Sequence, residues 1–419
     1  MSILKWRLVC VLITPGVALA GGFQLNVQGQ KALSMGEAGT ALSKDASVLF
    51  FNPGGVSLLR NKFNFTAGTS IIIPNISLQT EAVANTNQTS PIGTPIQFYA
   101  TAKLNEKASL GFAVNNQFGS TSSFDKDWEG KFIVQKLALK TFMYQPTFSY
   151  NINSRIGVGA GFVYTSGSFE FEKAVPVATA QYDNGQASLK GNGTGFSYNA
   201  GIQGILLKPD TTKWVSSLKA GFSYRSPIKL SLINGTAAFT DISVALQDQF
   251  PAQTSFNAQL TLPGVYSLGL QSNIRINEKI NIDVVIDYNR TMWSSYDSLK
   301  IDFSNAETPD SKIAKNWKDV STFRIGAGIN YNKILSIRLG AYYDQTPVRD
   351  GYVSPELPDN TNIAFTAGVG IELMENLSVD ISWLVSDFKR TASLEDAGFS
   401  ATYHRNVNVI GFGLNYTIK

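Results

Sequence analysis

The residue types that carry out most enzyme chemistry are nearly absent from this chain. Its 419 residues include one histidine, His404, and one cysteine, Cys10. Nucleophilic catalysis and histidine-based metal sites need such groups in paired motifs, and no such motif accompanies His404. The glycine-rich stretch 157–161 lies in an alternating segment with no helix after it, so it does not fit a phosphate-binding loop. We therefore expect no enzyme activity, no metal site and no cofactor.

The most distinctive stretch lies between positions 21 and 59, ahead of the first alternating segment. Small residues recur in it, and it closes on Asn-Pro-Gly-Gly at 52–55. Asp45 is placed to cap a short helix that runs through Phe51, and Pro53 then ends that helix. Four consecutive apolar residues, 48–51, crowd this short element and need cover. They fit the inside of a barrel or an apolar path better than an amphipathic turn on a surface.

The first twenty residues fit a secretory signal peptide, with Lys5 and Arg7 before an apolar core at 8–13 and Ala-Leu-Ala at 18–20. The apolar run is shorter than the roughly 20 residues of a membrane anchor. Cleavage after Ala20 removes Cys10 and leaves 399 residues, of which 33 are basic and 31 acidic. This balance gives no basis for nucleic-acid binding.

The rest of the chain alternates with period two, the pattern of strands that have one apolar and one polar or small face. Residues 322–331, 335–343 and 377–385 show it most clearly. Short polar turns alternate along the chain with long polar connections, as in outer-membrane barrels. The long connections are expected at 75–93, 119–135, 172–190, 231–253, 292–318, 346–360 and 389–401.

Counting the alternating segments gives fourteen strands. Pro263-Gly264 interrupts the segment 254–276, but treating it as a turn would give an odd count, whereas bacterial single-chain barrels have even counts. We therefore expect a bulge or kink there within one strand. Strands cross lipid only as a closed barrel, and a fourteen-stranded barrel has a lumen wide enough for a plug. The predicted fold is all-β: a 14-stranded antiparallel transmembrane β-barrel with a partly helical N-terminal hatch. Its parts are a signal peptide (1–20), the hatch segment (21–60) and the barrel (61–419).

Several segments resemble the FadL/TodX family of outer-membrane transporters for hydrophobic compounds. They are GFQLN at 22–26, ALSKDASVLFFNP at 41–53, GFAVNNQFG at 111–119, WKD at 317–319 and YDQTPVRDGYVSPELP at 343–358. The matches keep their order over nearly the whole chain after residue 20. The resemblance implies a barrel plugged by the hatch segment, in which an Asn-Pro-Ala motif packs beside an inward kink in the third strand. Gly54 stands where the family has alanine, which predicts a looser or differently packed contact.

The resemblance also implies candidate functional residues. The hatch gate comprises Asp45, Val48, Leu49, Phe50, Phe51, Asn52, Pro53 and Gly54. The kink, with a lateral opening into the bilayer, is expected at Ala113, Val114, Asn115, Asn116, Gln117, Phe118 and Gly119. Lys318 is a candidate partner for a substrate carboxylate, with a salt bridge to Asp319 as the alternative. A second basic position of the fatty-acid transporters falls on Phe171, with Lys173 two residues on.

The function implied by this resemblance is passive uptake of hydrophobic compounds across the outer membrane of a Gram-negative bacterium, by a monomer in contact with membrane lipids. Long-chain fatty acids are the first substrate class, and aromatic hydrocarbons are the alternative. Two alternative functions are disfavoured. A structural or adhesive outer-membrane barrel would gain nothing from a hatch packed inside it, and an outer-membrane lipid hydrolase would need a catalytic partner motif for His404, which the sequence lacks.

Overall fold

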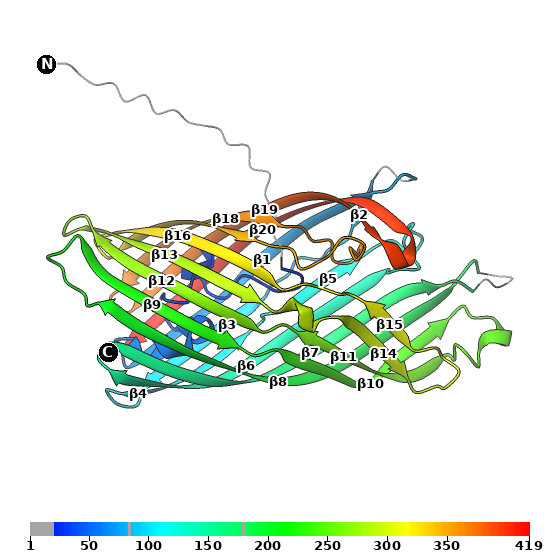
Figure 1. The fold of residues 1–419 in the computed structure, drawn as a ribbon, viewed down its shortest axis with the longest axis horizontal. Coiled ribbons are helices and arrows are strands. Elements are labelled where there is room, and N and C mark those ends of the chain that lie inside the picture. Colours follow the sequence, from blue (N-terminus) through cyan, green and yellow to red (C-terminus); the bar gives the residue numbers. More distant parts are fainter. Residues whose placement is uncertain (1–20, 83–84, 178, 180–181) are drawn as a thin grey trace, which may run out of the picture.

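The computed structural model describes residues 21–82, 85–177, 179 and 182–419. The predicted signal peptide lies outside the described residues. The described chain is a closed antiparallel β-barrel of fourteen strands, as the sequence predicts. β1 (Phe63–Gln79) and β20 (Phe399–Ile418) close it, paired from Phe63–Ile418 to Gln79–Thr402. Figure 1 shows the barrel from the side, with its strands tilted against the long axis.

Five barrel strands consist of two segments each, and β2 (Thr86–Gln88) belongs to a loop. The two-segment strands are β4 (Ala108–Asn115) with β5 (Gly119–Ser123), β9 (Val215–Arg225) with β10 (Ile228–Thr240), β11 (Gln253–Leu262) with β12 (Val265–Arg275), β13 (Ile280–Thr291) with β14 (Ser298–Phe303), and β15 (Ser311–Ala314) with β16 (Val320–Tyr331). The remaining strands are β3 (Ile96–Lys103), β6 (Lys136–Asn153), β7 (Ile156–Val175), β8 (Gly185–Leu207), β17 (Leu335–Asp344), β18 (Asn362–Met374) and β19 (Leu377–Leu394).

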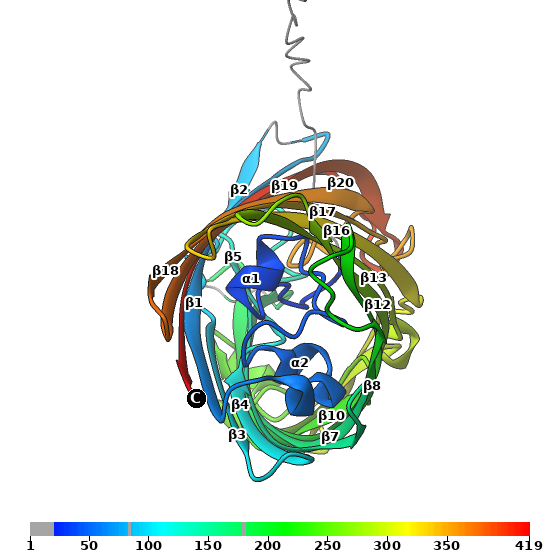
Figure 2. The same ribbon diagram turned by 90° about the vertical axis from the view of Figure 1, so that its left-hand side faces the viewer.

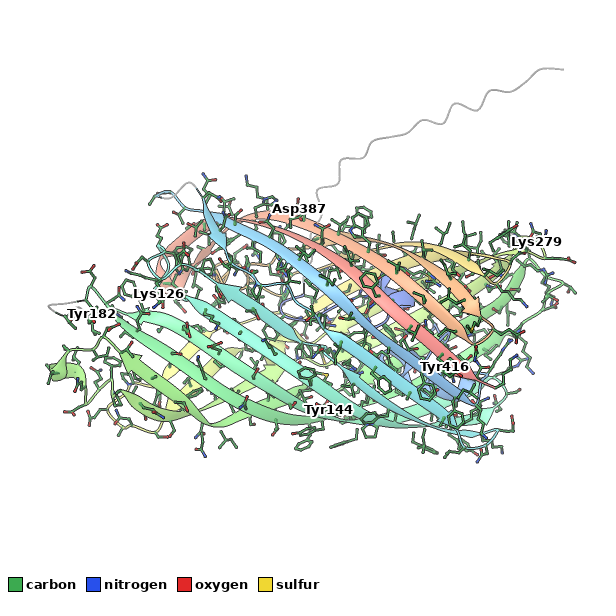
Figure 3. All side chains as sticks on the ribbon, turned by 180° about the vertical axis from the view of Figure 1, so that it is seen from behind. Lys126, Tyr144, Tyr182, Lys279, Asp387 and Tyr416 are labelled. Atoms are coloured by element: carbon green, nitrogen blue, oxygen red, sulfur yellow. The ribbon has the colours of Figure 1, made fainter. Side chains whose placement is uncertain are left out.

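The apolar face of each strand points outward. In β16, Phe323 and Ile325 are 53% and 54% exposed, whereas Arg324 between them is 6% exposed. Lipid favours apolar side chains outside, and the lumen accepts polar ones. Tyr144 and Tyr416 lie on this outer surface (Figure 3). Within the described ranges, no helix is long and apolar enough to span a bilayer.

Several strands run further toward the long-loop end than predicted. The expected connection 231–253 begins as strand β10, and the expected connection 292–318 contains β14 and β15. A strand needs only about 9–11 residues to cross the hydrocarbon layer, and β7 has 20. Beyond the lipid, neither face is selected for apolar residues, so the alternation that marks a strand in the sequence fades. This is why the predicted ends fall short.

Proline positions break two neighbouring barrel strands. Pro263 and Gly264 separate β11 from β12, and the two segments remain one barrel strand, as predicted. Ser226 and Pro227 separate β9 from β10 in the adjacent strand, a break that the sequence analysis did not predict. The two interruptions face each other, because β9 pairs with β12 and β10 with β11.

Candidate functional site

The hatch segment lies inside the barrel, where Figure 2 shows its helices within the ring of strands. It forms α1 (Gln30–Leu33), α2 (Val48–Phe51) and the 3₁₀ helix η1 (Pro53–Leu58). Asp45 accepts hydrogen bonds from the backbone N–H (2.9 Å) and hydroxyl (2.5 Å) of Ser47, just before α2. Leu49 and Val48 are fully buried. The four apolar residues of α2 thus obtain their cover from the barrel wall and the rest of the hatch.

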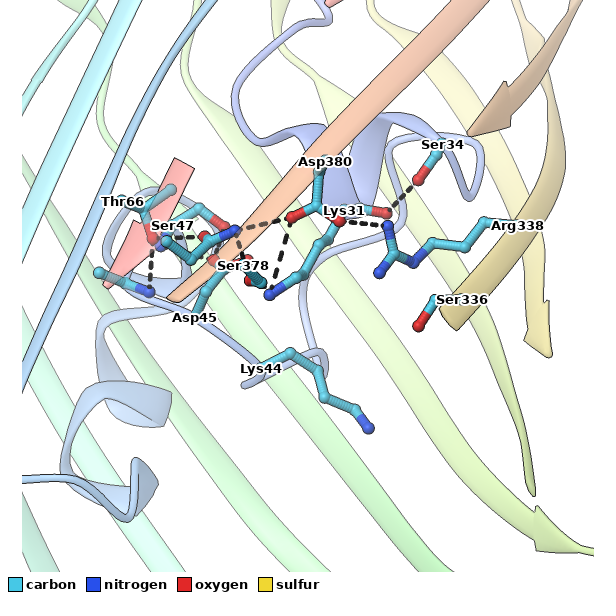
Figure 4. Close-up of polar contacts among 12 residues, drawn as sticks. Lys31, Ser34, Lys44, Asp45, Ser47, Thr66, Ser336, Arg338, Ser378 and Asp380 are labelled. Atoms are coloured by element: carbon cyan, nitrogen blue, oxygen red, sulfur yellow. Dashed lines mark hydrogen bonds and ion pairs between the residues drawn. The ribbon is translucent and has the colours of Figure 1, made fainter. Parts of the chain in front are cut away.

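A buried polar network ties α1 to the wall (Figure 4). Lys31 Nζ lies 3.7 Å from Asp45 Oδ2 and 3.8 Å from Asp380 Oδ2. Arg338 on β17 donates to Asp380 on β19, and the Asn415 amide on β20 donates to the same carboxylate at 2.7 Å. The hatch cation therefore shares its counter-ion with the barrel.

Asn52 fastens the second half of the hatch. Its side-chain amide donates to the carbonyl oxygens of Thr40 (2.9 Å) and Ile202 (3.0 Å), and its Oδ1 accepts from the Gly54 N–H (3.0 Å). The residue is completely buried. These three bonds join two hatch turns to β8, so the Asn52 side chain connects the hatch to the barrel wall.

Gly54 allows the hatch backbone to approach the wall more closely than alanine would. A Cβ at this position would lie 2.7 Å from the Gly201 carbonyl oxygen and 2.8 Å from that of Gly157. Both contacts are with backbone, which yields less readily than a side chain. The departure from the family's alanine is therefore accompanied by close packing against β7 and β8.

We predict that Gly54→Ala loosens the hatch without opening the barrel. Overpacking of this kind costs about 1–3 kcal/mol, which makes local opening of the hatch several-fold to about a hundredfold more frequent. Hydrogen–deuterium exchange of the amides in 48–58 measures this. Gly204→Ala on β8 is the matched control, because a Cβ there meets nothing within 4 Å. Equal exchange in both variants would contradict the close-packing argument.

The third barrel strand is interrupted at 116–118, between β4 and β5, inside the segment where a kink is predicted. The start of the hatch fills this break. Leu25 donates its N–H to the Gln117 carbonyl (2.8 Å), and Gly119 donates to the Phe23 carbonyl (2.9 Å). Gln24 and Phe118 form the β-bridge between these bonds. The unpaired backbone at the break is thereby satisfied by the hatch.

The expected neighbour of the kink, the Asn52-Pro53 motif, does not occupy the break. It packs against β7 and β8, where Gly159 and Gly201 leave room for it. The hatch instead reaches the third strand through Leu49, whose side chain would clash with a Cβ at Gly111. The glycines of the wall, rather than the broken strand, therefore determine where this motif lies.

An aromatic cluster covers the break on the lumen side. The Phe23 ring lies 5.1 Å from Trp293 and 5.6 Å from Trp317, and Trp293 and Trp317 are 4.8 Å apart. Tyr296 and Phe118 complete the group. It belongs to one buried apolar cluster that continues to loop residues near the barrel's long-loop end. A continuous buried apolar cluster thus leads through this half of the lumen to the start of the hatch.

The two lysines singled out from the sequence lie in different settings. Lys318 is exposed, because its neighbour Trp317 takes the inward position. The structure does not bring it to the aromatic cluster. Lys173 is half-buried near the loop end of β7, and none of the described residues forms an ion pair with it. Both lysines stay predicted partners for a carboxylate, and of the two only Lys173 is partly buried.

The buried lysine beside the aromatic cluster is Lys315, which the sequence analysis missed. Its Nζ lies 3.0 Å from Glu356 Oε1. Burial alone would favour the neutral form of both groups, but the attraction between the two charges outweighs this effect. It raises the pKa of Lys315 and lowers the pKa of Glu356. Lys315 is therefore already neutralised by the protein.

A polar cavity of about 60 Å³ lies between the hatch and the wall. Phe50, Phe51 and Gln117 line it, together with Arg225 of β9 and Trp293. This volume holds a few water molecules, whereas a cavity that binds benzene has about 150 Å³. The cavity is therefore too small to hold a hydrophobic molecule of that size.

Comparison with known proteins assigns the chain to a family. Residues 11–418 match the family model described as outer membrane protein transport protein (OMPP1/FadL/TodX). The chain belongs to this family. It is therefore an outer-membrane transport protein and not an enzyme, as the sequence predicts.

Relatives within the family are distant but cover nearly the whole chain. The long-chain fatty acid transport protein of Escherichia coli O6:H1 is 23% identical, over 97% of this chain and 96% of its own. Outer membrane protein P1 of Haemophilus influenzae Rd is also 23% identical, over 97% of each chain.

Among solved structures, a Pseudomonas aeruginosa FadL homologue has a TM-score of 0.80 at 16% identity, over 95% of this chain and 100% of its own. The Pseudomonas putida toluene transporter TodX has a TM-score of 0.71 at 15% identity, over 93% and 98%. At such identity the structures support the fold alone.

Proposed function

We propose that this protein takes up hydrophobic compounds, long-chain fatty acids first, by passive diffusion through a barrel gated by its hatch. The observation that carries this proposal is the buried apolar cluster, which runs from the loop end to Phe23 at the break in the third strand. Such a path lowers the free energy of an apolar solute by about 25 cal/mol per Å² of surface removed from water. A water-filled porin lumen offers no such gain.

The proposed route has three stages. The compound adsorbs at the loops and enters the apolar cluster. The segment from Phe23 to Gln28 then leaves the break in the third strand, which requires a few hydrogen bonds to break and the Phe23 ring to leave the aromatic cluster. The compound finally passes sideways into the bilayer through the break, or onward to the periplasm. The protein acts as a monomer surrounded by outer-membrane lipids.

Aromatic hydrocarbons are the second candidate substrates, and the aromatic cluster favours them. Phe23, Trp293 and Trp317 present ring faces and edges, which attract a further aromatic ring beyond simple area burial. The proteins similar to this chain include one named a long-chain fatty acid transport protein and one named a toluene transporter.

Uptake by a Gram-negative host that lacks its own fatty-acid transporter tests the proposal. We expect oleate uptake several-fold above that of the empty vector, at matched protein levels in the outer membrane. Toluene uptake measured in the same cells decides between the two substrate classes. If uptake of both compounds equals that of the empty vector, the proposed function is wrong.

A further inference from the structure

Arg225 is a buried cation for which the described protein supplies no carboxylate. It is 6% exposed. Its Nη2 donates to the Phe50 carbonyl and to Gln145 Oε1, both at 3.1 Å, and its Nη1 has no partner. The guanidinium also lies 4.7 Å from the centre of the Phe50 ring. An unpaired buried charge is costly, and Lys315, by contrast, has Glu356.

Other unpartnered polar groups gather around Arg225 on the same inward wall. Asn199 lies opposite Arg225 in the β8–β9 register, and both its amide atoms are buried without a partner. Ser197 is the next inward residue of β8, and its hydroxyl is also unpartnered. The wall therefore presents hydrogen-bond donors that the protein itself does not use.

The lining of the cavity next to Arg225 is mostly polar and also includes apolar side chains. Arg225 and Asn199 belong to it, and so do Trp293 and Val320 of the apolar cluster. Such a surface matches a molecule with a charged head and an apolar chain.

Three carboxylates also face this cavity, and each accepts at least one hydrogen bond from the protein, although Glu37 Oε2 has no partner. Asp287 accepts from the N–H groups of Gly39 (2.9 Å) and Thr40 (2.8 Å). Glu37 accepts from the Gln28 N–H, and Asp344 from the Thr322 hydroxyl. Arg324, which lines the same cavity, is a cation that attracts all three carboxylates. Arg225 is left for an anion from outside.

We propose that Arg225, with Asn199 and Ser197, binds the carboxylate head of an amphipathic substrate whose chain lies in the apolar cluster. This assignment rests on the proposed function and makes it more specific. A carboxylate here competes with the Phe50 carbonyl for the guanidinium, and charge-assisted hydrogen bonds are the stronger ones. Head-group binding therefore weakens the contact that holds α2 to β9.

The test compares oleate with oleyl alcohol, which has the same chain and no charge. Binding of each is measured to the full protein in phospholipid nanodiscs, with empty discs as background. The wild type is expected to bind oleate at least about tenfold more tightly. Arg225→Gln removes this preference for oleate over oleyl alcohol, whereas Arg225→Lys retains it. Arg155→Gln, in the exposed turn before β7, is the matched control and behaves as wild type.

Each outcome is decisive. A hatch merely loosened by the substitution changes the binding of both ligands alike, and that result would overturn the assignment. Equal binding of oleate and oleyl alcohol by the wild-type protein would by itself overturn the assignment, and would mean that the cavity holds only water. In both cases uptake of hydrophobic compounds, and hence the proposed function, survives. If neither ligand binds and uptake is also absent, the proposed function fails as well.

Discussion

Replacing Asp380 by alanine is expected to destabilise the folded barrel by about 3–5 kcal/mol. Asp380 is 1% exposed and faces two cations, Lys31 of the hatch and Arg338 of β17. Its removal leaves Arg338 without a carboxylate partner in the lumen and frees one end of the hatch. The free energy of unfolding in guanidinium chloride, measured for the protein in lipid bilayers, gives the change.

Asp387→Ala is the matched control for this prediction. Asp387 lies on the same strand, but its side chain is 30% exposed and pairs with His404 at 2.8 Å on the outer surface (Figure 3). A surface pair of this kind contributes less than about 1 kcal/mol. The double variant Asp380→Ala with Arg338→Met is expected to recover part of the loss, because it removes the stranded charge. If Asp380→Ala costs no more than Asp387→Ala, the network does not anchor the hatch.

The barrel was predictable because its signal is local. In β16, outward and inward residues alternate one by one, so the sequence shows both the strand and its apolar face. The turn at Asn332-Lys333 was recognisable from its polar residues, and both adopt positive φ (52° and 60°), where asparagine is favoured. Alternation and short turns together led to the correct strand count.

The site was less predictable, because its contacts join residues far apart in the chain. Arg225 lies 175 positions from Phe50, the hatch residue whose carbonyl oxygen it contacts. The one local signal was the alternation along β9, which places Arg225 at a position facing the lumen, two residues before Pro227. Lys318 was chosen from a motif, but only the path of the loop shows that Trp317 turns inward and Lys318 outward. The position of the Asn52-Pro53 motif similarly depends on glycines in strands that come a hundred residues later.

The second large effect concerns the segment that fills the break in the third strand. Gln24 and Phe118 face each other in a non-hydrogen-bonded antiparallel pair, flanked by the bonds Leu25 N–H to Gln117 and Gly119 N–H to Phe23. The Cα atoms of such a pair are about 4.5 Å apart, within the range of about 4.4–6.8 Å that a disulfide spans. Cys10 is the only cysteine and precedes the predicted cleavage site, so an introduced pair has no competing thiol in the mature chain.

Uptake of oleate and toluene by cells that carry Gln24→Cys with Phe118→Cys is therefore the most direct test of a gate at this break. We predict that the oxidised protein transports at least about tenfold less than the same protein after reduction, because the disulfide holds the segment in place. The two single-cysteine variants control for the substitutions themselves and are expected not to respond to oxidation. Equal uptake by the oxidised and reduced double variant would contradict the hatch-gated route.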